Sequence, residues 1–447
     1  MKTLMITAMQ SGAGKTVISC ALMAALKKRG LAISAFKCGP DYIDPMFHES
    51  VLGIPSRNLD LFLQGESGVK RSLSRAKGDL AILEGAMGYY DGAGGTEEAS
   101  AYQISSLTGT PAVLVLRPKG SGLTLAAQVR GMQAFRPGGH IRALILSECT
   151  ERLADYLRPI LERETGLPVL GFLPPMPEAE IDSRHLGLLT AAEMEDLSVR
   201  MEKLAAAAEQ NLELDRLIVL AGDYIGESES PKSCPVRCRI AVARDEAFCF
   251  TYEDTLDSLR EAGAELCFFS PIRDLSLPDS TDGLYLPGGY PELYAERLSD
   301  NTALRQQIAE RISAGLPTVA ECGGFLYLQQ SLENPKGQVF PMCAVLPGRG
   351  FRTERLQRFG YQRLKADEDS LLFRAGENVP AHEFHYWDST ECGRSLRSEK
   401  TDGRVWRCGY TGKNLYAAFP HLCFGGELPL AERFVKACEI WKASMKQ

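Results

Sequence analysis

Apolar residues gather in short, mostly unbroken runs along the first half of the chain, separated by stretches with helical spacing. The runs occupy residues 3–8, 31–37, 79–85, 111–116, 141–147 and 167–174. Runs of this kind are typical of strands buried on both faces of a parallel sheet. Between the first two, Lys15–Arg29 has apolar residues at helical spacing and is followed by Gly30, which favours a helix C-terminus. This strand–helix–strand order predicts a doubly wound α/β domain.

A break near the middle of the chain separates this pattern from a second one. Glu227–Pro235 is rich in serine, proline and charge and has no hydrophobic periodicity, which is typical of a linker. Predicted strands follow at 238–244, 265–271, 282–289 and 317–321. Predicted helices lie at 252–262, in the stretch that runs through Ile312, and at the C-terminal end. A chain of 447 residues also exceeds one ordinary core. We therefore predict two α/β domains, 1–226 and 238–447, joined by a linker at 227–237.

Composition and charge exclude several classes of protein. The net charge of −7 argues against a nucleic-acid-binding protein, which usually carries a basic field. No apolar run approaches the ~18 residues of a membrane span, and the N-terminal segment is too short for a secretory signal. The 13 cysteines, an odd number scattered along a long chain, indicate free thiols in a reducing compartment. We expect a cytoplasmic protein that binds neither nucleic acid nor membrane.

The segment SGAGKT lies between the first predicted strand and the first predicted helix, where a phosphate-binding loop belongs. Gly12 and Gly14 allow backbone amides to converge on an anion, and the helix N-terminus adds its dipole. Lys15 can reach the terminal phosphates, and the Thr16 hydroxyl can bind Mg²⁺. Met9 stands where the strict pattern has glycine. A glycine turn beside a solvated lysine is the alternative, but the strand–loop–helix context favours nucleotide binding.

Charged and aromatic residues follow two further predicted strands. Glu84 ends the run LAIL, at the edge where open parallel sheets bind ligands, and suits a second Mg²⁺ ligand. The segment FKCGPDYIDP follows another strand and is typical of a substrate loop, and MGYYDG repeats this pattern after Glu84. The substrate-binding candidates in these two loops are Lys37, Tyr42, Ile43, Asp44 and Asp91. The simpler alternative for Glu84 is that it caps a turn. The simpler alternative for FKCGPDYIDP is a turn whose acidic side chains are solvated.

A second catalytic pattern, TVAECGGFLYL, occurs about three hundred residues later. Cys322 stands between an apolar strand and the start of a helix, flanked by small residues, as in a nucleophile elbow. The amide of Gly323 can stabilise an oxyanion, and Gly289, in a glycine pair after another predicted strand, can supply a second amide.

The thiol of Cys322 needs a base to become a nucleophile. Among the six histidines, His421 follows a strand-like segment late in the chain and is the favoured base. His382 and His385 share the segment HEFHYW, and we expect one of these two to be a core histidine with satisfied hydrogen bonds. A thiol that attacks an amide carbonyl predicts amide hydrolysis with release of ammonia.

With both sites described, the chain resembles the cobyrinate a,c-diamide synthase family over nearly its whole length. The motifs that carry the resemblance are, in order, SGAGKT, FKCGPDYIDPMFH, SRNLDLF, EGAMGYYDG, RHLGLL, ARDEAFCFTYEDTLDSL, LPGGYPELYAERL, AECGGFLYL and HEFHYWD. Each motif is modestly specific, and the ordered set is very specific.

The resemblance implies a fused enzyme, with a dethiobiotin synthetase-like ATPase in its first half and a triad-type class I glutamine amidotransferase in its second. The family uses ATP and Mg²⁺ to activate acetate side chains of a tetrapyrrole as acyl phosphates, and amidates them with ammonia from glutamine. The matching residues are Lys15, Thr16, Asp41 and Glu84 for phosphate and metal, Cys322 as nucleophile and His421 as its activating histidine. The resemblance leaves the oligomeric state open, and a homodimer is one of the assemblies that fit it.

Three positions depart from the family pattern. Ala8 replaces a usual glycine before the phosphate loop, and Arg117 stands where many relatives carry aspartate. Cys423 occupies the position, two residues after the histidine, where wider amidotransferases place a glutamate. The third member of the triad is therefore unassigned, and a Cys–His dyad is an alternative.

Two other functions stay open at this point. The same chemistry on hydrogenobyrinate or nickel-sirohydrochlorin is one, because the sequence does not separate these macrocycles well. A nucleotide-switch ATPase of the partitioning type, with a degenerate amidotransferase-like tail, is the other. The intact Cys322, His421 and both glycine pairs argue against the second alternative.

Overall fold

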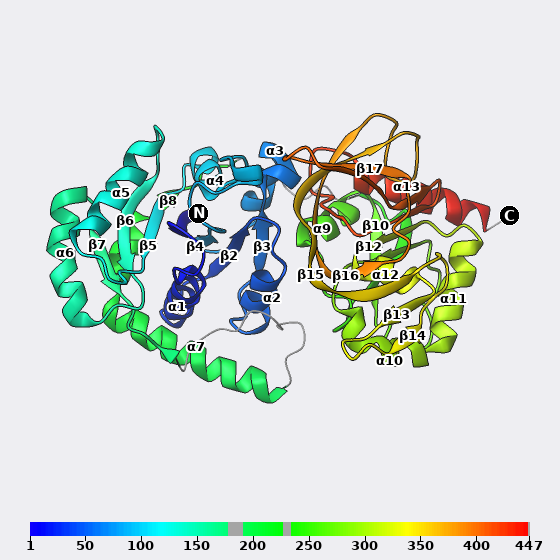
Figure 1. The fold of residues 1–447 in the computed structure, drawn as a ribbon, viewed down its shortest axis with the longest axis horizontal. Coiled ribbons are helices and arrows are strands. Elements are labelled where there is room, and N and C mark those ends of the chain that lie inside the picture. Colours follow the sequence, from blue (N-terminus) through cyan, green and yellow to red (C-terminus); the bar gives the residue numbers. More distant parts are fainter. Residues whose placement is uncertain (178–190, 227–233, 446–447) are drawn as a thin grey trace. The chain divides into compact units, whose positions relative to one another are not determined.

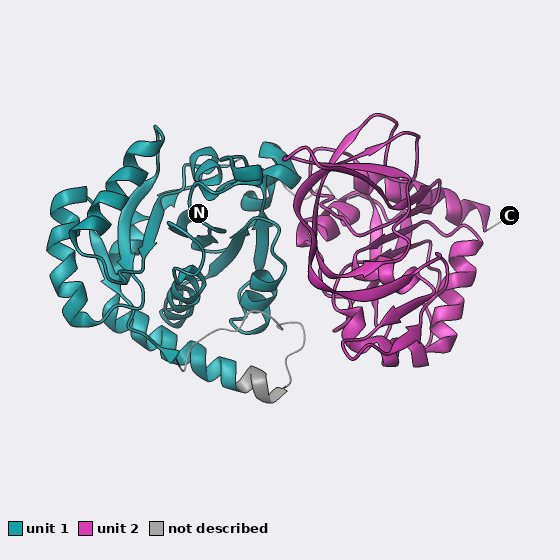
Figure 2. Ribbon diagram, in the orientation of Figure 1, with its two compact units in different colours: residues 1–229 teal, residues 230–447 magenta. Residues whose placement is uncertain are grey.

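The chain forms two compact units, Met1–Glu229 and Ser230–Gln447, in a computed structural model (Figures 1 and 2). The structure describes residues 1–177, 191–226 and 234–445. Residues 227–233 of the predicted linker, and the motif RHLGLL at 184–189, lie outside the described residues. Each unit is an α/β structure, which confirms the predicted fold class.

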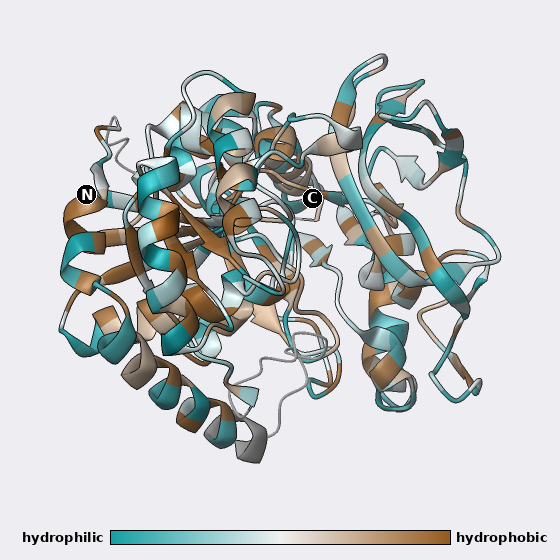
Figure 3. Ribbon diagram, turned by 60° about the vertical axis from the view of Figure 1, so that its left-hand side comes forward, coloured by the Kyte–Doolittle hydropathy of each residue, from teal (hydrophilic) through white to brown (hydrophobic). Residues whose placement is uncertain are grey.

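A parallel sheet forms the centre of the first unit. Its strands, in spatial order, are β3 (Ser56–Leu59), β2 (Ile33–Cys38), β4 (Leu80–Glu84), β1 (Lys2–Ala8), β5 (Ala112–Leu116), β6 (Ile141–Leu146) and β7 (Val169–Phe172), and β8 (Gly222–Asp223) pairs antiparallel with β1. Every residue of β2, β4 and β5 is buried, which explains why these strands read as unbroken apolar runs. Figure 3 shows the strands of this sheet as mostly hydrophobic.

Helices cover both faces of this sheet, as the doubly wound pattern predicts. They are α1 (Lys15–Lys28), α2 (Ile43–Ser50), α3 (Leu61–Ser74), α4 (Ala101–Thr108), α5 (Leu123–Phe135), α6 (Glu151–Thr165), α7 (Ala191–Asn211) and α8 (Leu214–Leu220). Buried side chains of α1, α2 and α7 belong to one apolar cluster, and those of α3, α4, α5 and α6 belong to a second one. The sheet therefore separates two cores. Gly30, at φ 86°, follows the end of α1 as expected.

The strand register brings the predicted phosphate and acid residues to one edge of the first sheet. Ile6 of β1 lies opposite Glu84 of β4, and Lys37 of β2 lies opposite the same glutamate. The loop that connects β1 to α1 begins two residues beyond Ile6, after Ala8. Because these strands are parallel, their carboxyl ends meet at this edge, where ligands of such sheets bind.

The second unit contains a mainly parallel sheet with the order β10 (Ala264–Phe269), β9 (Cys238–Ala243), β11 (Gly283–Leu286), β12 (Thr318–Glu321), β20 (Leu415–Ala418) and β19 (Tyr410–Gly412). Its helices are α9 (Glu253–Glu261), α10 (Ala295–Asp300), α11 (Thr302–Ser313), α12 (Gly323–Leu328) and α13 (Leu430–Ser444). Each of the strands predicted for this half corresponds to one of β9 to β12. The short α12 begins directly after β12, with Cys322 between them.

A second, largely antiparallel sheet in this unit was not predicted. It runs in the order β14 (Val339–Pro341), β13 (Ser331–Glu333), β15 (Arg349–Ala366), β16 (Asn378–Ser389) and β21 (His421–Leu422), with β17 (Leu396–Lys400) pairing β15 and β18 (Val405–Cys408) pairing β17. The longest strand, β15, is mostly polar and only partly buried. An antiparallel strand with one solvated face produces no apolar run, so the criterion that found the parallel strands missed it. No helix of the described residues is long and apolar enough to cross a membrane.

Candidate active sites

Gly14 ends the predicted phosphate loop and has two separate reasons to be glycine. Its φ of 90° lies in the left-handed region, and a Cβ there would lie 2.2 Å from the Oγ atom of Ser147. The first turn of α1 begins at the next residue, so its backbone amides face the loop. This is the local geometry that a phosphate group requires.

Lys15 is buried and folds back over its own loop. Its Nζ donates hydrogen bonds to the carbonyl oxygens of Gln10 (3.1 Å) and Met87. Burial, and then the charge of Lys37, lower the pKa of Lys15 to about 8. Both present acceptors are neutral carbonyls, and an anionic phosphate oxygen is a stronger acceptor for an ammonium group. Lys15 is therefore placed to exchange these bonds for contacts with a nucleotide.

Glu84 is the centre of a buried charged cluster beside this loop. Its Oε1 accepts hydrogen bonds from Thr16 Oγ1 (2.6 Å) and Lys37 Nζ (2.8 Å), and Lys37 also forms an ion pair with Asp44. Burial opposes ionisation of Glu84, but Lys37 and then His48 hold its pKa below the ordinary value. Burial raises the pKa of Asp44 to about 7. The predicted substrate residues Lys37 and Asp44 thus contact the Glu84 cluster and are themselves buried.

The oxygen atoms of Thr16 and Glu84 fit a magnesium ion. They lie 2.6 Å apart, and hard oxygen ligands together with phosphate oxygens are the usual surroundings of Mg²⁺. Among the described residues, no group of three or more His, Cys, Asp or Glu side chains is arranged to hold a metal ion by itself. A nucleotide-dependent site, in which the phosphates complete the coordination, agrees with both observations.

Asp41 lies at the start of α2, where its Oδ1 accepts hydrogen bonds from the backbone amides of Ile43 (2.7 Å) and Asp44 (3.2 Å). Tyr42 and Ile43 are half-buried. Asp91 is exposed, and its Oδ2 accepts from the amide of Gly88 (2.8 Å). Asp41 therefore has a local role, capping a helix, beside its predicted role as a metal ligand.

Substitution of Asp41 separates these two roles. Asp41→Asn keeps an oxygen that can cap α2 and removes the negative charge, whereas Asp41→Ala removes both. We expect the Asn variant to melt as wild type does but to need more Mg²⁺ for ammonium-dependent amidation, and the Ala variant also to lose about 1 kcal/mol of stability. Thermal melts and Mg²⁺ titrations of both variants measure this. An unchanged Mg²⁺ requirement in the Asn variant would remove Asp41 from the metal site.

Arg117 also reaches the phosphate loop. One guanidinium nitrogen donates to the carbonyl oxygen of Gly12 (3.3 Å), and another forms an ion pair with Glu148. Position 117 therefore holds a cation that contacts the loop backbone.

Cys322 has the strained backbone of a nucleophile elbow. Its φ of 47° and ψ of −100° are unusual for a residue other than glycine, and it lies between β12 and α12. Its backbone amide donates to the carbonyl oxygen of Ala418 on the neighbouring β20 (2.8 Å). Burial, and then the charge of Glu292, raise the pKa of the Cys322 thiol well above its ordinary value. The resting thiol is therefore protonated.

The two predicted oxyanion amides lie beside one another. A Cβ on Gly323 would lie 3.0 Å from the backbone nitrogen of Gly289, so the two backbones approach closely. A hydrogen bond from the amide of Gly323 favours the Cys322 thiolate and partly offsets the effect of burial. This amide therefore points toward the reacting sulfur, as an oxyanion site requires.

His421 lies on β21, in the antiparallel sheet, only three residues after β20 of the parallel sheet. Its ring packs against Gly288, because a Cβ at Gly288 would lie 2.4 Å from His421 Cε1. Burial, and then the nearby His382 and His385, lower the pKa of His421 to about 3. These two shifts describe a protonated thiol and a neutral imidazole at rest, and a neutral imidazole can accept a thiol proton.

The other two candidate histidines differ in their surroundings. His385 Nε2 lies 2.7 Å from Glu383 Oε1, its Nδ1 contacts the carbonyl oxygen of Trp387, and its ring stacks on Phe419. His382 pairs with His421 in the strand register. His385 thus has the hydrogen bonds of a satisfied core histidine.

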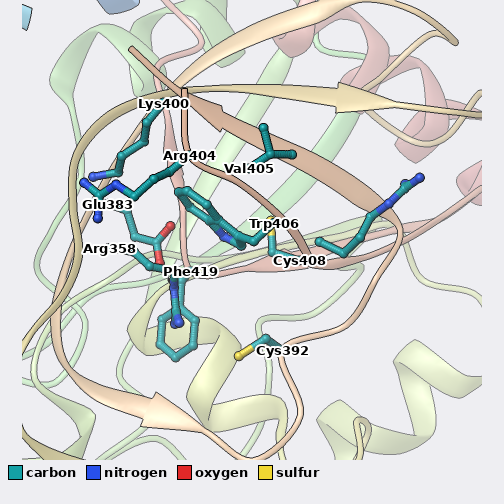
Figure 4. Close-up of a pocket in the computed structure, with 10 residues that line it drawn as sticks. Arg358, Glu383, Cys392, Lys400, Arg404, Val405, Trp406, Cys408 and Phe419 are labelled. Atoms are coloured by element: carbon teal, nitrogen blue, oxygen red, sulfur yellow. Dashed lines mark hydrogen bonds and ion pairs between the residues drawn. The ribbon is translucent and has the colours of Figure 1, made fainter. Parts of the chain in front are cut away.

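A cavity of about 480 Å³ opens near these residues (Figure 4). It is lined by Arg358, Glu383, Cys392, Lys400, Arg404, Val405, Trp406, Arg407, Cys408 and Phe419. Arg358, at a strained φ of 40°, forms ion pairs with Glu383 (2.7 Å) and Asp388 (2.6 Å). Glu383, which lines this cavity, contributes to the raised pKa of Cys322, so this side chain lies within electrostatic range of the thiol.

Gly288→Ala tests the packing of His421. The added methyl group would displace the imidazole, and we expect glutamine-dependent activity to fall by ~10²-fold with ammonium-dependent activity unchanged. Gly412→Ala, on β19 of the same unit, is the matched control because nothing lies within 4 Å of the added atom. If Gly288→Ala and Gly412→Ala were equally active with glutamine and also with ammonium, the packing of His421 against Gly288 would not matter for its role.

Two family descriptions match this chain over separate ranges. A CobQ/CobB/MinD/ParA nucleotide binding domain matches residues 4–189, and a CobB/CobQ-like glutamine amidotransferase domain matches residues 239–428. The two matches fall in the first and second units respectively.

Curated relatives match over nearly the whole chain. A protein of Clostridium acetobutylicum named cobyrinate a,c-diamide synthase is 38% identical over 98% of this chain and 100% of its own length. Relatives with the same name in Clostridium tetani (38%, 98% of this chain and 99% of the relative) and Thermoplasma volcanium (36%, 97% and 96%) agree. The chain belongs to the cobyrinate a,c-diamide synthase family. Members of this family are glutamine-dependent ligases, which confirms the predicted class of enzyme.

Sequence reasoning missed two residues that this member of the cobyrinate a,c-diamide synthase family places in its sites. Ser147, after β6, approaches Gly14 of the phosphate loop. Glu321, the last residue of β12 and the residue before Cys322, is buried, and its Oε2 is 4.0 Å from His421 Nδ1. The sequence did contain a signal for Glu321. A glutamate in a strand that is predicted to be buried needs a polar partner, because an unpaired charge there is costly.

Proposed function

We propose that this chain converts the a and c acetate carboxylates of cobyrinate to amides, in cobalamin biosynthesis, with ATP and glutamine as co-substrates. The observation that carries the proposal is the presence, in one chain, of a strained Cys322 beside paired amides and of a phosphate loop beside Glu84. The first site suits release of ammonia, and the second suits activation of a carboxylate. Relatives with the corresponding name match almost the full chain.

Glutamine hydrolysis would begin when His421 accepts the thiol proton of Cys322. The sulfur attacks the side-chain carbonyl carbon of glutamine, and the resulting oxyanion accepts hydrogen bonds from the amides of Gly289 and Gly323. His421 then gives its proton to the departing nitrogen, which leaves as ammonia, and a γ-glutamyl thioester of Cys322 forms. Water, deprotonated by His421, cleaves the thioester and releases glutamate and the free thiol.

Carboxylate activation would occur at the phosphate loop of the first unit. An acetate oxygen of the macrocycle attacks the γ-phosphorus of ATP, ADP departs, and an acyl phosphate forms. Ammonia then attacks the acyl carbon and expels inorganic phosphate, which leaves the amide. Lys15 stabilises the charge on the transferring phosphoryl group. Thr16 and Glu84, with Asp41, would hold Mg²⁺, which neutralises charge on the phosphate oxygens.

The loop at Tyr42, Ile43 and Asp44, and the loop of Asp91, would lie near the macrocycle, because both follow strands that end at the phosphate-loop edge. Tyr42 and Ile43 are only half-buried, so their side chains are open to contact with a ligand. Each of the 13 cysteines is a free thiol, which supports a reducing compartment such as the cytoplasm.

A comparison of macrocycles tests this function. The purified chain is incubated with ATP, Mg²⁺ and glutamine, and with cobyrinate, hydrogenobyrinate or nickel-sirohydrochlorin, and the products are analysed by mass spectrometry. We expect two amidations of cobyrinate, at a higher kcat/KM than for either alternative. A higher kcat/KM for another macrocycle would reassign the substrate, and amidation of none of them would contradict the proposed function.

A further inference from the structure

We propose that Glu321 is the third member of the glutaminase triad, a positioning residue that acts through His421. The proposal rests on the proposed glutaminase function. The position that supplies a glutamate in wider amidotransferases holds Cys423 here, and a thiol is a weak hydrogen-bond acceptor. Glu321 would supply the carboxylate from a different strand, directly before the nucleophile.

The position of Glu321 is fixed on two sides. Its Oε1 accepts a hydrogen bond from the backbone amide of Leu422 (2.9 Å), and its Oε2 accepts one from the hydroxyl of Tyr285 (3.0 Å). Leu422 is the residue after His421 on β21, so one of these bonds ties the carboxyl group to the strand that carries the base. Only 1% of Glu321 is exposed, and therefore water does not compete for its oxygens.

The distance from Glu321 Oε2 to His421 Nδ1 is 4.0 Å. Hydrogen bonds of catalytic groups are often long in a ligand-free site and shorten in the complex. A bond from Nδ1–H to this oxygen would select the tautomer that leaves the Nε2 lone pair to accept the thiol proton. The carboxyl group thus orients the base and selects its protonated nitrogen.

The same carboxyl group would compensate the charge that the reaction creates. When His421 takes the proton of Cys322, an imidazolium forms in a buried site, where an unpaired charge is costly. Burial raises the pKa of Glu321 to about 8, while Tyr285 and Leu422 donate hydrogen bonds that favour the ionised form. A neighbouring imidazolium favours ionisation further. The ionisable groups with a polar contact to the carboxyl are Tyr285 and His421, and Tyr416 and Cys322 lie within electrostatic range of it.

Glu383 is, with Glu292, another buried carboxylate that acts on the thiol, and its surroundings differ from those of Glu321. It is held by Arg358 (2.7 Å), by His385 (2.7 Å) and by the amide of Gln362 (2.8 Å). Its charge is thus compensated by a cation of its own, whereas the polar contacts of Glu321 are a hydroxyl, a backbone amide and the base. Glu321 is therefore the better partner for an imidazolium at His421.

Substitution of Glu321 tests the proposal. Glu321→Gln keeps the size of the side chain and an acceptor for Leu422, and removes the charge. We expect kcat for glutamine hydrolysis to fall by ~10²-fold with little change in KM, and ammonium-dependent amidation to stay at the wild-type level. Glu321→Asp, which keeps the carboxylate but is shorter, should retain more glutaminase activity than Glu321→Gln. If the side chain of Glu321 served only to fill space, Glu321→Gln, which keeps its size, would retain more glutaminase activity than Glu321→Asp. That order would overturn the proposal.

A double-mutant cycle with His421 shows whether Glu321 acts through the base. We expect His421→Ala and the combined His421→Ala, Glu321→Gln variant to have the same residual glutaminase activity, because the positioning role vanishes with the imidazole. Fully multiplicative losses would overturn the proposal. A wild-type chain without glutaminase activity would instead contradict the proposed function itself, so the two failures are distinguishable.

Discussion

Cys322→Ser is expected to lower glutamine-dependent amidation by ~10⁴-fold and to leave ammonium-dependent amidation at the wild-type level. A serine hydroxyl is far harder to ionise than a thiol, and a neutral His421 whose pKa is lowered to about 3 is a weak base for that purpose. The residues proposed to activate the carboxylates lie in the other unit, and that reaction would need only ammonia as a nucleophile. High ammonium concentration and mildly alkaline pH should therefore restore product formation.

The two nitrogen sources are measured side by side on wild type, Cys322→Ser and a control, Cys343→Ser. Cys343 is a suitable control because it lies in the same apolar cluster and is as buried as Cys322, each being 5% exposed. The control should keep both activities. Loss of ammonium-dependent synthesis in a well-folded Cys322→Ser protein would contradict the assignment of the two reactions to separate sites.

Lys15→Ala is expected to lower amidation from both nitrogen sources by ~10³-fold or more while the fold is kept. Lys15 would neutralise charge on the transferring phosphoryl group, and positioned charge is most of what such a site contributes. Among the described residues, the ammonium group of Lys15 donates its hydrogen bonds to the carbonyl oxygens of Gln10 and Met87, and its removal breaks no ion pair there. Glutamine hydrolysis without macrocycle should continue in this variant.

Lys28→Ala is the matched control for Lys15→Ala, because Lys28 is an exposed lysine on the same helix, α1. We expect its amidation rates and its melting temperature to equal those of wild type. Near-normal amidation by a folded Lys15→Ala protein would remove the phosphate-loop assignment.

The sequence was sufficient to predict the residues that stand at the ends of buried parallel strands. Glu84 and Lys37 were found because apolar runs mark where such strands end, and parallel strands bring their carboxyl ends to one edge. Lys15 was found from the glycine-rich motif that joins the first of these strands to α1. Cys322 was found for the same reason as Glu84, since β12 is a short apolar strand followed by glycines. At these positions a local pattern determines the spatial arrangement.

Residues that come together through pairing between distant segments could not be predicted in this way. The short polar strand β3 and the half-exposed β15 have no apolar run, although both lie in sheets. Glu321 approaches His421 only because β12 and β20 are neighbours and the chain then crosses to β21. If the third triad residue is sought two residues after His421 in the sequence, the residue found there is Cys423 instead.

Isotope labelling tests the central claim, that one chain transfers the amide nitrogen of glutamine to carboxylates activated by ATP. The wild-type chain is given cobyrinate, ATP, Mg²⁺ and glutamine labelled with ¹⁵N at its side-chain amide, without added ammonium. We predict a product that carries ¹⁵N in both new amides, with one ADP, one phosphate and one glutamate formed for each. Amidation without ATP, or ATP hydrolysis with no ¹⁵N in the macrocycle, would contradict the account.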